Sequence, residues 1–258
     1  MQIDRYMYYC MTVSGLWYTF HHFEYNFFKT GEQKMIRPNA LHHIAISTGD
    51  IKKQIEYFSD VLGMELIALY WMHGVEGAWH GFMRLGEAAV AFVFMPQNRD
   101  LETTIGHTHP GHGGGSSAPG TLQHLALNVD THEEMLAMRD RIRSRGIPVM
   151  GPIDHGLCFS IYFAGPENLT LEISTNDKAD YPLDLDGTWI DPEVVKLAGI
   201  SEEELARYQN PAPFETPTQS VPQPEYDESK PHLAYPHDRT ARQAPDRQKS
   251  IPCAGGSD

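Results

Sequence analysis

The sequence has few cysteines, a shortage of basic residues and no long apolar run, and each shortage excludes a class of protein. Cys10, Cys158 and Cys253 are odd in number and far apart, which matches neither a disulfide framework nor a zinc motif and fits a reducing cytoplasm. With 20 Lys and Arg against 34 Asp and Glu, the net charge is −14, which argues against nucleic acid or an anionic membrane as partner. No run approaches the roughly 20 apolar residues that cross a bilayer. We therefore expect a soluble, cytoplasmic protein.

An internal repeat organises the middle of the chain. LHHIAI at residues 41–46 returns as LQHLAL at 122–127. After the first stretch, helical spacing over 51–63 precedes strand candidates at 64–73, 78–85 and 88–96. After the second, Asp130 or Thr131 can cap a helix over 132–145, and strand candidates follow at 147–153, 157–163 and 169–174. Matching type, order and spacing predict two βαβββ modules, at 39–96 and 121–176.

The predicted fold class is α+β, with the two modules forming one cupped mixed sheet. An aromatic-rich arm, 1–38, precedes them; it is either a packing arm or an over-extended translation, since Met35 opens a natural domain start. The Gly- and His-rich segment 97–120 is predicted to be a long loop, either a lid or a solvated segment. In 177–258 we expect one helix over 191–209 and then a Pro-rich tail that wraps the domain or stays disordered.

Histidines inside apolar strands point to a metal. Because alternate strand residues share a face, His43 and His124 would leave the helix side and enter one concavity, and His42 would face the helix layer or solvent. Glu172, among Leu and Ile in LTLEIS, is a carboxylate that needs a partner in such a strand. The matching position of the first module is Ala91. Two His and one carboxylate leave coordination positions open, as in non-haem Fe(II) sites.

These residues resemble the vicinal oxygen chelate superfamily, which includes glyoxalase I, the fosfomycin and bleomycin resistance proteins, and the type I extradiol ring-cleaving dioxygenases. The likeness covers about 39–175. Residues 153–172, IDHGLCFSIYFAGPENLTLE, are similar to the extradiol dioxygenase signature, with His155, Tyr162 and the ligand Glu172 in order. Gly165 and Asn168 depart from that signature at turn positions.

The resemblance implies a site of five residues and leaves one role open. It makes His43, His124 and Glu172 the metal ligands and gives His155 and Tyr162 the task of stabilising an anionic substrate. Ala88 stands where the dioxygenases carry an acid–base histidine. His80 is our candidate for that role; His73, Glu87 and the loop histidines at 107, 109 and 112 are alternatives that no spacing rule separates.

The function implied is Fe(II)-dependent cleavage of a catechol or related dihydroxylated aromatic by O2, with Mn(II), Zn(II) or Ni(II) as alternative metals. Apolar strands would supply a wall for the ring, with Trp71, Trp79, Phe82 and Phe92 as candidates. The alternatives are a glyoxalase-like isomerase or lyase, or a non-catalytic small-molecule binding or resistance protein of the same superfamily. We expect a homo-oligomer that binds neither nucleic acid nor membrane.

Overall fold

The computed structural model describes residues 37–72, 74–182, 190–213, 219–231 and 233. Residues 1–212 and 213–258 form two separate units, and both βαβββ modules lie in the first. Most of the arm expected at 1–38 and most of the C-terminal tail lie outside the described residues, and so does His73. Within the described part, no helix is long and apolar enough to cross a membrane.

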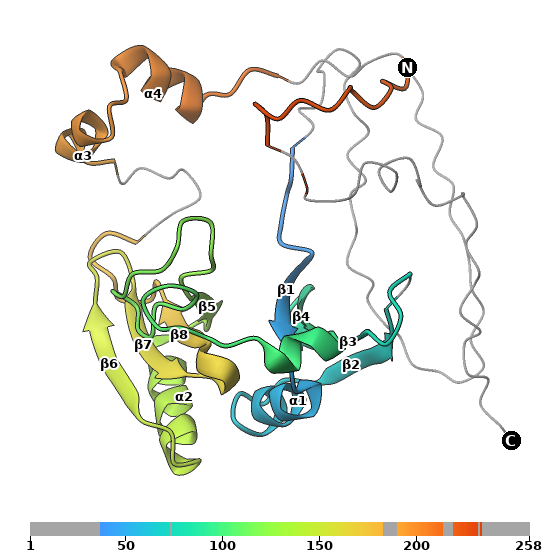
Figure 1. Ribbon diagram of the computed structural model, residues 1–258. Helices are drawn as coiled ribbons and strands as arrows, with labels where there is room; N and C mark the ends of the chain where they lie inside the picture. The colour runs from blue at the N-terminus through green and yellow to red at the C-terminus, as the bar shows by residue number, and fades with distance from the viewer. Residues whose placement is uncertain (1–36, 73, 183–189, 214–218, 232, 234–258) are drawn as a thin grey trace, which may run out of the picture. The chain divides into compact units, whose positions relative to one another are not determined.

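The first module has the predicted order of elements (Figure 1). It consists of β1 (His43–Thr48), α1 (Ile51–Asp60), β2 (Leu66–Trp71), β3 (Trp79–Leu85) and β4 (Ala88–Phe94). The strands form a four-stranded sheet in the order β1-β4-β3-β2, with β1 parallel to β4 and the other pairs antiparallel. Asp50 caps α1, because its Oδ1 accepts from the Lys53 backbone N–H at 3.1 Å.

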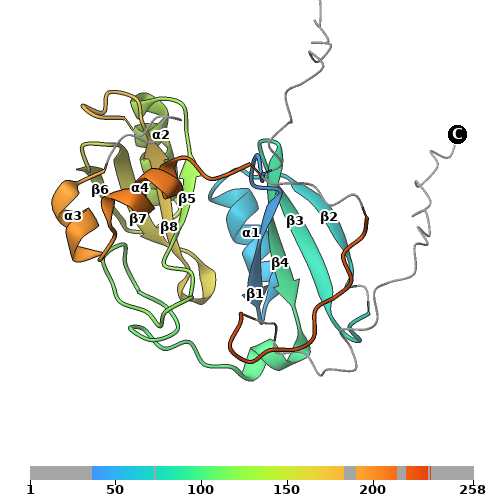
Figure 2. The same cartoon turned by 90° about the horizontal axis from the view of Figure 1, so that it is seen from above.

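The second module repeats this topology with β5 (Leu125–Asn128), α2 (His132–Ser144), β6 (Val149–Asp154), β7 (Phe159–Ala164) and β8 (Thr170–Thr175). Its sheet has the order β5-β8-β7-β6, again with one parallel pair, β5 and β8. Thr131, rather than Asp130, caps α2, and it forms a reciprocal capping box with Glu134. The two-module prediction is confirmed, although the eight strands form two separate sheets instead of one (Figure 2).

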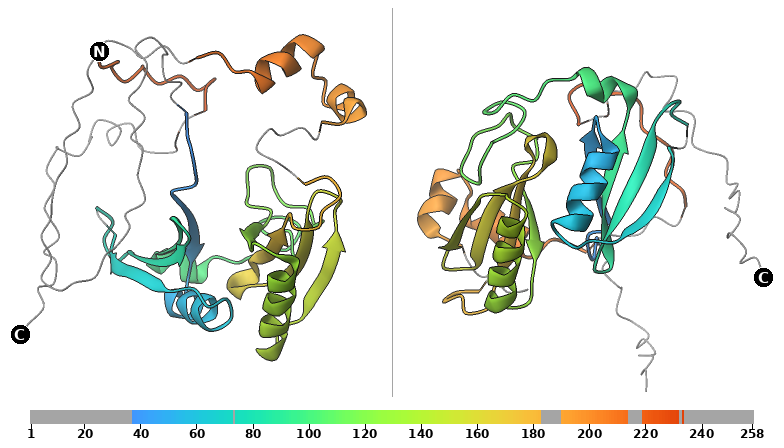
Figure 3. Two further views of the ribbon diagram at one scale, coloured as in Figure 1. Left: turned by 180° about the vertical axis from the view of Figure 1, so that it is seen from behind. Right: turned by 90° about the horizontal axis from the view of Figure 1, so that it is seen from below.

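Each helix covers one face of its own sheet (Figure 3). In β4, Val90 and Phe92 point to the helix and are fully buried, and the Phe92 ring meets Phe58 of α1 at 4.8 Å between centroids. Gly81 of β3 allows this close packing, since a Cβ there would lie 3.3 Å from both Ile51 and Ile55. Apolar residues of both modules belong to one hydrophobic cluster. The opposite face of each sheet is therefore free to hold polar chemistry.

Polar contacts join the two modules. Arg145 pairs with Asp60 at 2.9 Å, and this guanidinium holds the pKa of the exposed Asp60 carboxyl below its usual range. Arg141 donates to the backbone oxygens of Val61 and Asp60, at the end of α1. Glu167 reaches across from the short 3-10 helix Pro166–Asn168: its carboxylate accepts from the Gly49 backbone N–H at 2.8 Å and from Gln54 Nε2 at 2.7 Å.

The predicted single helix over 191–209 is wrong: two helices lie there, α3 (Pro192–Leu197) and α4 (Glu202–Gln209). Gly199 adopts a φ of 71°, a left-handed conformation that ends α3. Ser201 then starts α4 as its N-cap and forms a capping box with Glu204. The stop and start signals within GISEEE therefore override the apolar spacing on either side.

Candidate functional site

His124 and Glu172 lie together on the open face of the second sheet. His124 immediately precedes β5, and Glu172 lies on β8, where its neighbour in the parallel register is Ala126. His124 Nε2 is 2.8 Å from Glu172 Oε2, and the Glu172 side chain is 5% exposed. Ser174 Oγ donates to the other oxygen, Oε1, at 2.6 Å. The carboxylate predicted to need a partner therefore has two, one at each oxygen.

The imidazole of His124 lies between two acceptors. Its Nδ1 contacts Gln123 Oε1, and its Nε2 faces the carboxylate of Glu172. A neutral imidazole carries a single N–H, so it can satisfy one of these acceptors but not both. A second proton or a metal ion at Nε2 resolves the conflict. The pair thus fits a divalent cation, with Nε2 and Oε2 as adjacent donors.

Tyr162 and His155 lie beside this pair. Tyr162 on β7 is opposite Glu172 in the antiparallel register, and its ring centroid is 5.9 Å from that of His124. Its hydroxyl lies 3.2 Å from Nε2 of His155, which follows β6. Burial, and then the negative charge of Glu172, raise the pKa of Tyr162 to about 12. The phenol therefore keeps its proton at neutral pH and can act as a hydrogen-bond donor.

The structure does not bring His43 to this pair. His43 starts β1 on the open face of the first sheet, where its ring lies 5.8 Å from that of Phe82. Its Nδ1 is 2.8 Å from Nδ1 of His42, so the exposed His42 faces its neighbour's ring. Among the described residues, no group of three His, Cys, Asp or Glu side chains is placed to hold a metal. His43 as third ligand stays a prediction.

The strand registers make Ala91 the counterpart of Glu172. Ala91 on β4 pairs with Ala45 and with Phe82, as Glu172 on β8 pairs with Ala126 and with Tyr162. The first module therefore offers a methyl group where the second offers a carboxylate, and a phenyl ring where the second offers a phenol.

His80, our candidate for the proton-transfer role, lies in the first module near His43. Its ring contacts those of Tyr70 and Phe82 at 5.8 and 5.9 Å. The His80 Nε2 atom is buried and has no hydrogen-bond partner among the described residues. A buried, unpartnered ring nitrogen is costly and is a place where a ligand group can bind. The structure thus joins His80 to His43 through Phe82, but not to Tyr162 or His155.

Of the four aromatic residues proposed as a wall for the ring, Phe82 alone lies on the face of His43. Phe92 is fully buried against α1. Trp79 stacks on Phe94 at 4.2 Å, and Trp71 packs on Trp79, so both lie on the helix side of the sheet. The sequence pattern did not separate the faces because these strands carry apolar residues on both.

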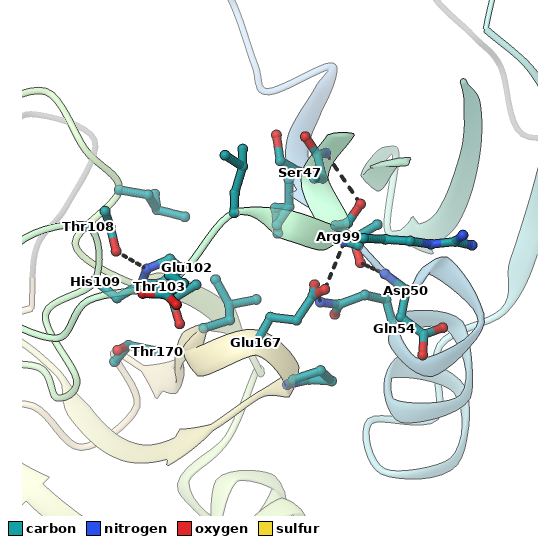
Figure 4. A pocket seen from close by; sticks show the side chains of 18 of the residues that line it. Ser47, Asp50, Gln54, Arg99, Glu102, Thr103, Thr108, His109, Glu167 and Thr170 are labelled. Carbon is teal, nitrogen blue, oxygen red and sulfur yellow. Dashed lines mark hydrogen bonds between the residues drawn. The ribbon is translucent and has the colours of Figure 1, made fainter. Parts of the chain in front are cut away.

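A cavity of about 800 Å³ lies between β1, the loop that joins the two modules, and the residues around Glu167 (Figure 4). Its lining includes Ala45 and Ser47 of β1, Glu167, and the loop residues Thr108 and His109, which are hydrogen-bonded to each other at 2.9 Å. Gln123, next to His124, also lines it. Part of the predicted loop at 97–120 therefore lines this cavity, and its role as a lid stays a prediction.

Sequence reasoning missed two residues of this region. Gln123 precedes His124 as His42 precedes His43, and that parallel was the available signal. Glu167 lies inside the signature-like stretch, between the two positions that depart from it, and has the left-handed backbone angles φ 56° and ψ 36°. A non-glycine residue in that region carries strain that its surroundings must offset. No sequence pattern assigned Glu167 a partner 118 residues away.

The comparisons with known proteins identify the family. A probable lactoylglutathione lyase of Synechocystis sp. is 27% identical over 144 residues, 54% of this chain and 98% of that protein. A glyoxylase/bleomycin resistance protein/dioxygenase domain from Frankia sp. has a TM-score of 0.45 at 10% identity, over 55% of this chain and 95% of that one. A mutant of the fosfomycin resistance protein FosX from Listeria monocytogenes, solved with Mn(II), has a TM-score of 0.39 at 17% identity, over 53% and 92%. The model of the Glyoxalase/Bleomycin resistance protein/Dioxygenase superfamily matches residues 40–190, and the chain belongs to that superfamily.

Proposed function

We propose that this protein is a metal-dependent ring-cleaving dioxygenase whose ligands are His43, His124 and Glu172. The proposal starts from the His124–Glu172 pair, in which a ring nitrogen and a carboxylate oxygen lie 2.8 Å apart, with an acceptor at the other ring nitrogen. His43 holds its Nδ1 against His42, which leaves its Nε2 for a ligand. Two imidazoles and one carboxylate suit Fe(II), and also Mn(II), Zn(II) or Ni(II).

The observation that carries the reaction type is the position of Tyr162. Its protonated hydroxyl lies beside the Glu172 and His124 ligands and is hydrogen-bonded to His155. A catechol oxygen bound near those ligands would accept a hydrogen bond from this phenol, which stabilises negative charge as it develops. His155 holds the phenol in place and can exchange a proton with it. A bound Fe(II) would supply the electron transfer between catechol and O2 that ring cleavage requires.

Removal of the second catechol proton needs a base, and His80 is our candidate. Its buried Nε2 lacks a partner among the described residues and lies in the same aromatic cluster as His43. Ala88, at the start of β4, cannot serve. A ring nitrogen within reach of the substrate could accept this proton as the aromatic diol approaches Phe82.

The third ligand must come from outside the second module, and we propose that it is His43 of a second copy of the chain. The contacts of Glu167 with Gly49 and Gln54, and of Arg145 with Asp60, hold the two modules of one chain together. Within the described residues, His43 is not beside His124 in that arrangement. In a twofold dimer, His43 of each copy would complete the pair of the other.

The test is metal analysis of anaerobically purified protein, followed by O2 uptake and the appearance of a yellow product with a panel of catechols. We expect iron and O2 consumption in the wild type, and loss of both in Glu172→Gln. Glu203→Gln on the exposed surface of α4 is the control and should change neither. Bound iron without O2 uptake on any diphenol would refute the dioxygenase and leave the metal site standing.

A second candidate is a lyase that uses the metal as a Lewis acid, and one observation favours it: the relative in Synechocystis is named a probable lactoylglutathione lyase. Formation of S-lactoylglutathione from glutathione and methylglyoxal by metal-loaded protein, without O2 uptake on catechols, would select this reaction. A metal-loaded protein active in neither assay points to the third alternative, a binding or resistance protein.

A further inference from the structure

Gln123 connects the candidate ligand His124 to the loop that precedes it. Its Oε1 contacts His124 Nδ1. Its Nε2 donates to the backbone oxygen of Gly113 at 2.7 Å and lies 3.3 Å from that of Gly115. One side chain thus joins a ring nitrogen of the ligand to the backbone of the loop.

These contacts fix which way the amide of Gln123 points. Carbonyl oxygens only accept hydrogen bonds, so the nitrogen of the amide must face Gly113 and its oxygen must face His124. The Nδ1 of His124 therefore carries a proton, and Nε2, which faces Glu172 at 2.8 Å, is the nitrogen that takes either a second proton or a metal ion. A histidine that binds metal through one nitrogen is oriented in the same way when the other nitrogen donates to a fixed oxygen.

The same loop packs on Tyr162. A Cβ at Gly113 would lie 2.7 Å from Cε1 of that ring, closer than real Cβ atoms approach, so only glycine permits this contact. Gly114, the next residue, has ordinary space: the nearest atoms to a Cβ there are in the His112 ring at 3.7 Å. Gly113 therefore contacts the candidate site twice, through Gln123 next to the ligand His124 and through the ring of Tyr162.

We propose that Gln123 is a positioning residue that couples the seating of the loop to the orientation of His124, so that the metal binds more tightly when the loop is docked. This inference rests on the metal site proposed above. The first module has the equivalent of one of these contacts, because His42 contacts Nδ1 of His43 as Gln123 contacts Nδ1 of His124. The described structure gives His42 no contact with the loop, so the coupling belongs to the second module.

Three variants of the full chain separate the two contacts of Gln123, one with the His124 ring and one with the loop backbone. Gln123→Leu removes both contacts. Gln123→Glu keeps an oxygen for His124 Nδ1 but cannot donate to the backbone oxygen of Gly113. Gly113→Ala displaces the loop from Tyr162 and leaves Gln123 intact, and Gly114→Ala is its matched control. We expect Mn(II) affinity, titrated calorimetrically, to fall about 10- to 100-fold in Gln123→Leu, the range for such partners of ligands. The two single-arm variants should fall less, and Gly114→Ala should match the wild type.

Two readouts on metal-free protein keep this inference distinct from the metal site itself. Hydrogen exchange of the amides of 107–118 should rise in all three variants but not in Gly114→Ala. The ¹⁵N spectrum of labelled histidines should show a proton on Nδ1 of His124 in the wild type and in Gln123→Glu, and the loss of that proton in Gln123→Leu. Wild-type protein that binds no Mn(II) refutes the proposed function. If the hydrogen exchange of the loop amides and the Nδ1 proton of His124 are both unchanged in Gln123→Leu, the coupling is refuted, whatever the metal affinity.

Discussion

Nε2 of His124 lies 2.8 Å from Oε2 of Glu172, while the other nitrogen of the same ring contacts the oxygen of Gln123. The ring therefore has acceptors on both sides, and the carboxylate is 5% exposed. Burying an ionised carboxylate is expensive unless it is paired with a cation or with hydrogen-bond donors. We expect that a cation held between the two groups would lower this cost further, so a bound metal should be detectable through the stability of the fold.

The first prediction concerns stability in the presence of metal. A ligand that binds the folded state alone stabilises it by about 2.7 kcal/mol at one hundred times its Kd. We therefore expect the midpoint of thermal unfolding to rise by several degrees on addition of Mn(II) or anaerobic Fe(II). His124→Ala should abolish the rise, because one of two adjacent donors is lost. Differential scanning calorimetry with and without metal measures it; a full rise in His124→Ala would remove this pair from the site.

The second prediction concerns Tyr162. Because burial and Glu172 raise its pKa from 10 to about 12, Tyr162 should ionise at a higher pH than an exposed tyrosine does. Absorbance at 295 nm measured against pH, as a difference between the wild type and Tyr162→Phe, should show that late step. The folded pKa exceeds the unfolded one, so any contribution to stability is present below pH 10 and is lost as the pH rises from 10 toward 12. A step near pH 10 would contradict the assigned environment.

Catalytic activity tests the role of the Tyr162 hydroxyl as a hydrogen-bond donor independently of its pKa. Tyr162→Phe keeps the ring that packs on His124 and loses the donor, so catechol turnover should fall by about 10²-fold, within the range for loss of one donor to a developing anion. Metal content should stay at the wild-type level, because the phenol is not a ligand. Loss of metal in this variant would make Tyr162 a structural support of the ligands instead.

Site residues were predictable from the sequence where their placement depends on a local pattern, and not where it depends on how the sheets pack. The repeat of His43 and His124 was visible because strand alternation is local, and Glu172 stood out as a charge in an apolar strand. Tyr162 and His155 came from their positions in a signature-like stretch, and the structure bonds them to each other. The separation of His43 from the pair was not predictable, because it depends on how whole sheets pack.

The same distinction applies to the fold. Helix and strand positions follow local patterns, and the two modules were predicted with the correct order. The misassigned helix at 191–209 had Gly199 and Ser201 in its middle, which are a stop and a start signal that apolar spacing conceals. The faces of Trp71, Trp79 and Phe92 depended on the pairing of strands, which alternation cannot settle when both faces are apolar.

The third prediction concerns the source of His43. His43→Ala and His124→Ala chains, each inactive alone, should complement each other if the site is shared between copies. In a mixed twofold dimer one site would carry both substitutions and the other none, so about half of the wild-type metal and activity should return. Co-expression with two different tags isolates the mixed dimer. A monomer in sedimentation, or a mixed dimer without metal, would place all the ligands within one chain.

The fourth prediction concerns the contact between modules at Glu167. Its two oxygens accept from the Gly49 N–H and from Gln54 Nε2, and Gln54 is 1% exposed. Glu167→Gln keeps the shape but turns an amide N–H toward one of these donors, so an unmatched donor is left in a part-buried place. We expect the free energy of unfolding to fall by about 1–3 kcal/mol.

Urea unfolding measures this change, and Glu102→Gln is the matched control. Glu102 lines the same cavity but is exposed, so its substitution should leave the urea midpoint within error of the wild type. The slope of the transition should be unchanged in both variants, since neither alters the surface exposed on unfolding. Equal midpoints for the two variants would mean that Glu167 does not hold the modules together, and His43 of the same chain could then reach His124 by movement of the sheets.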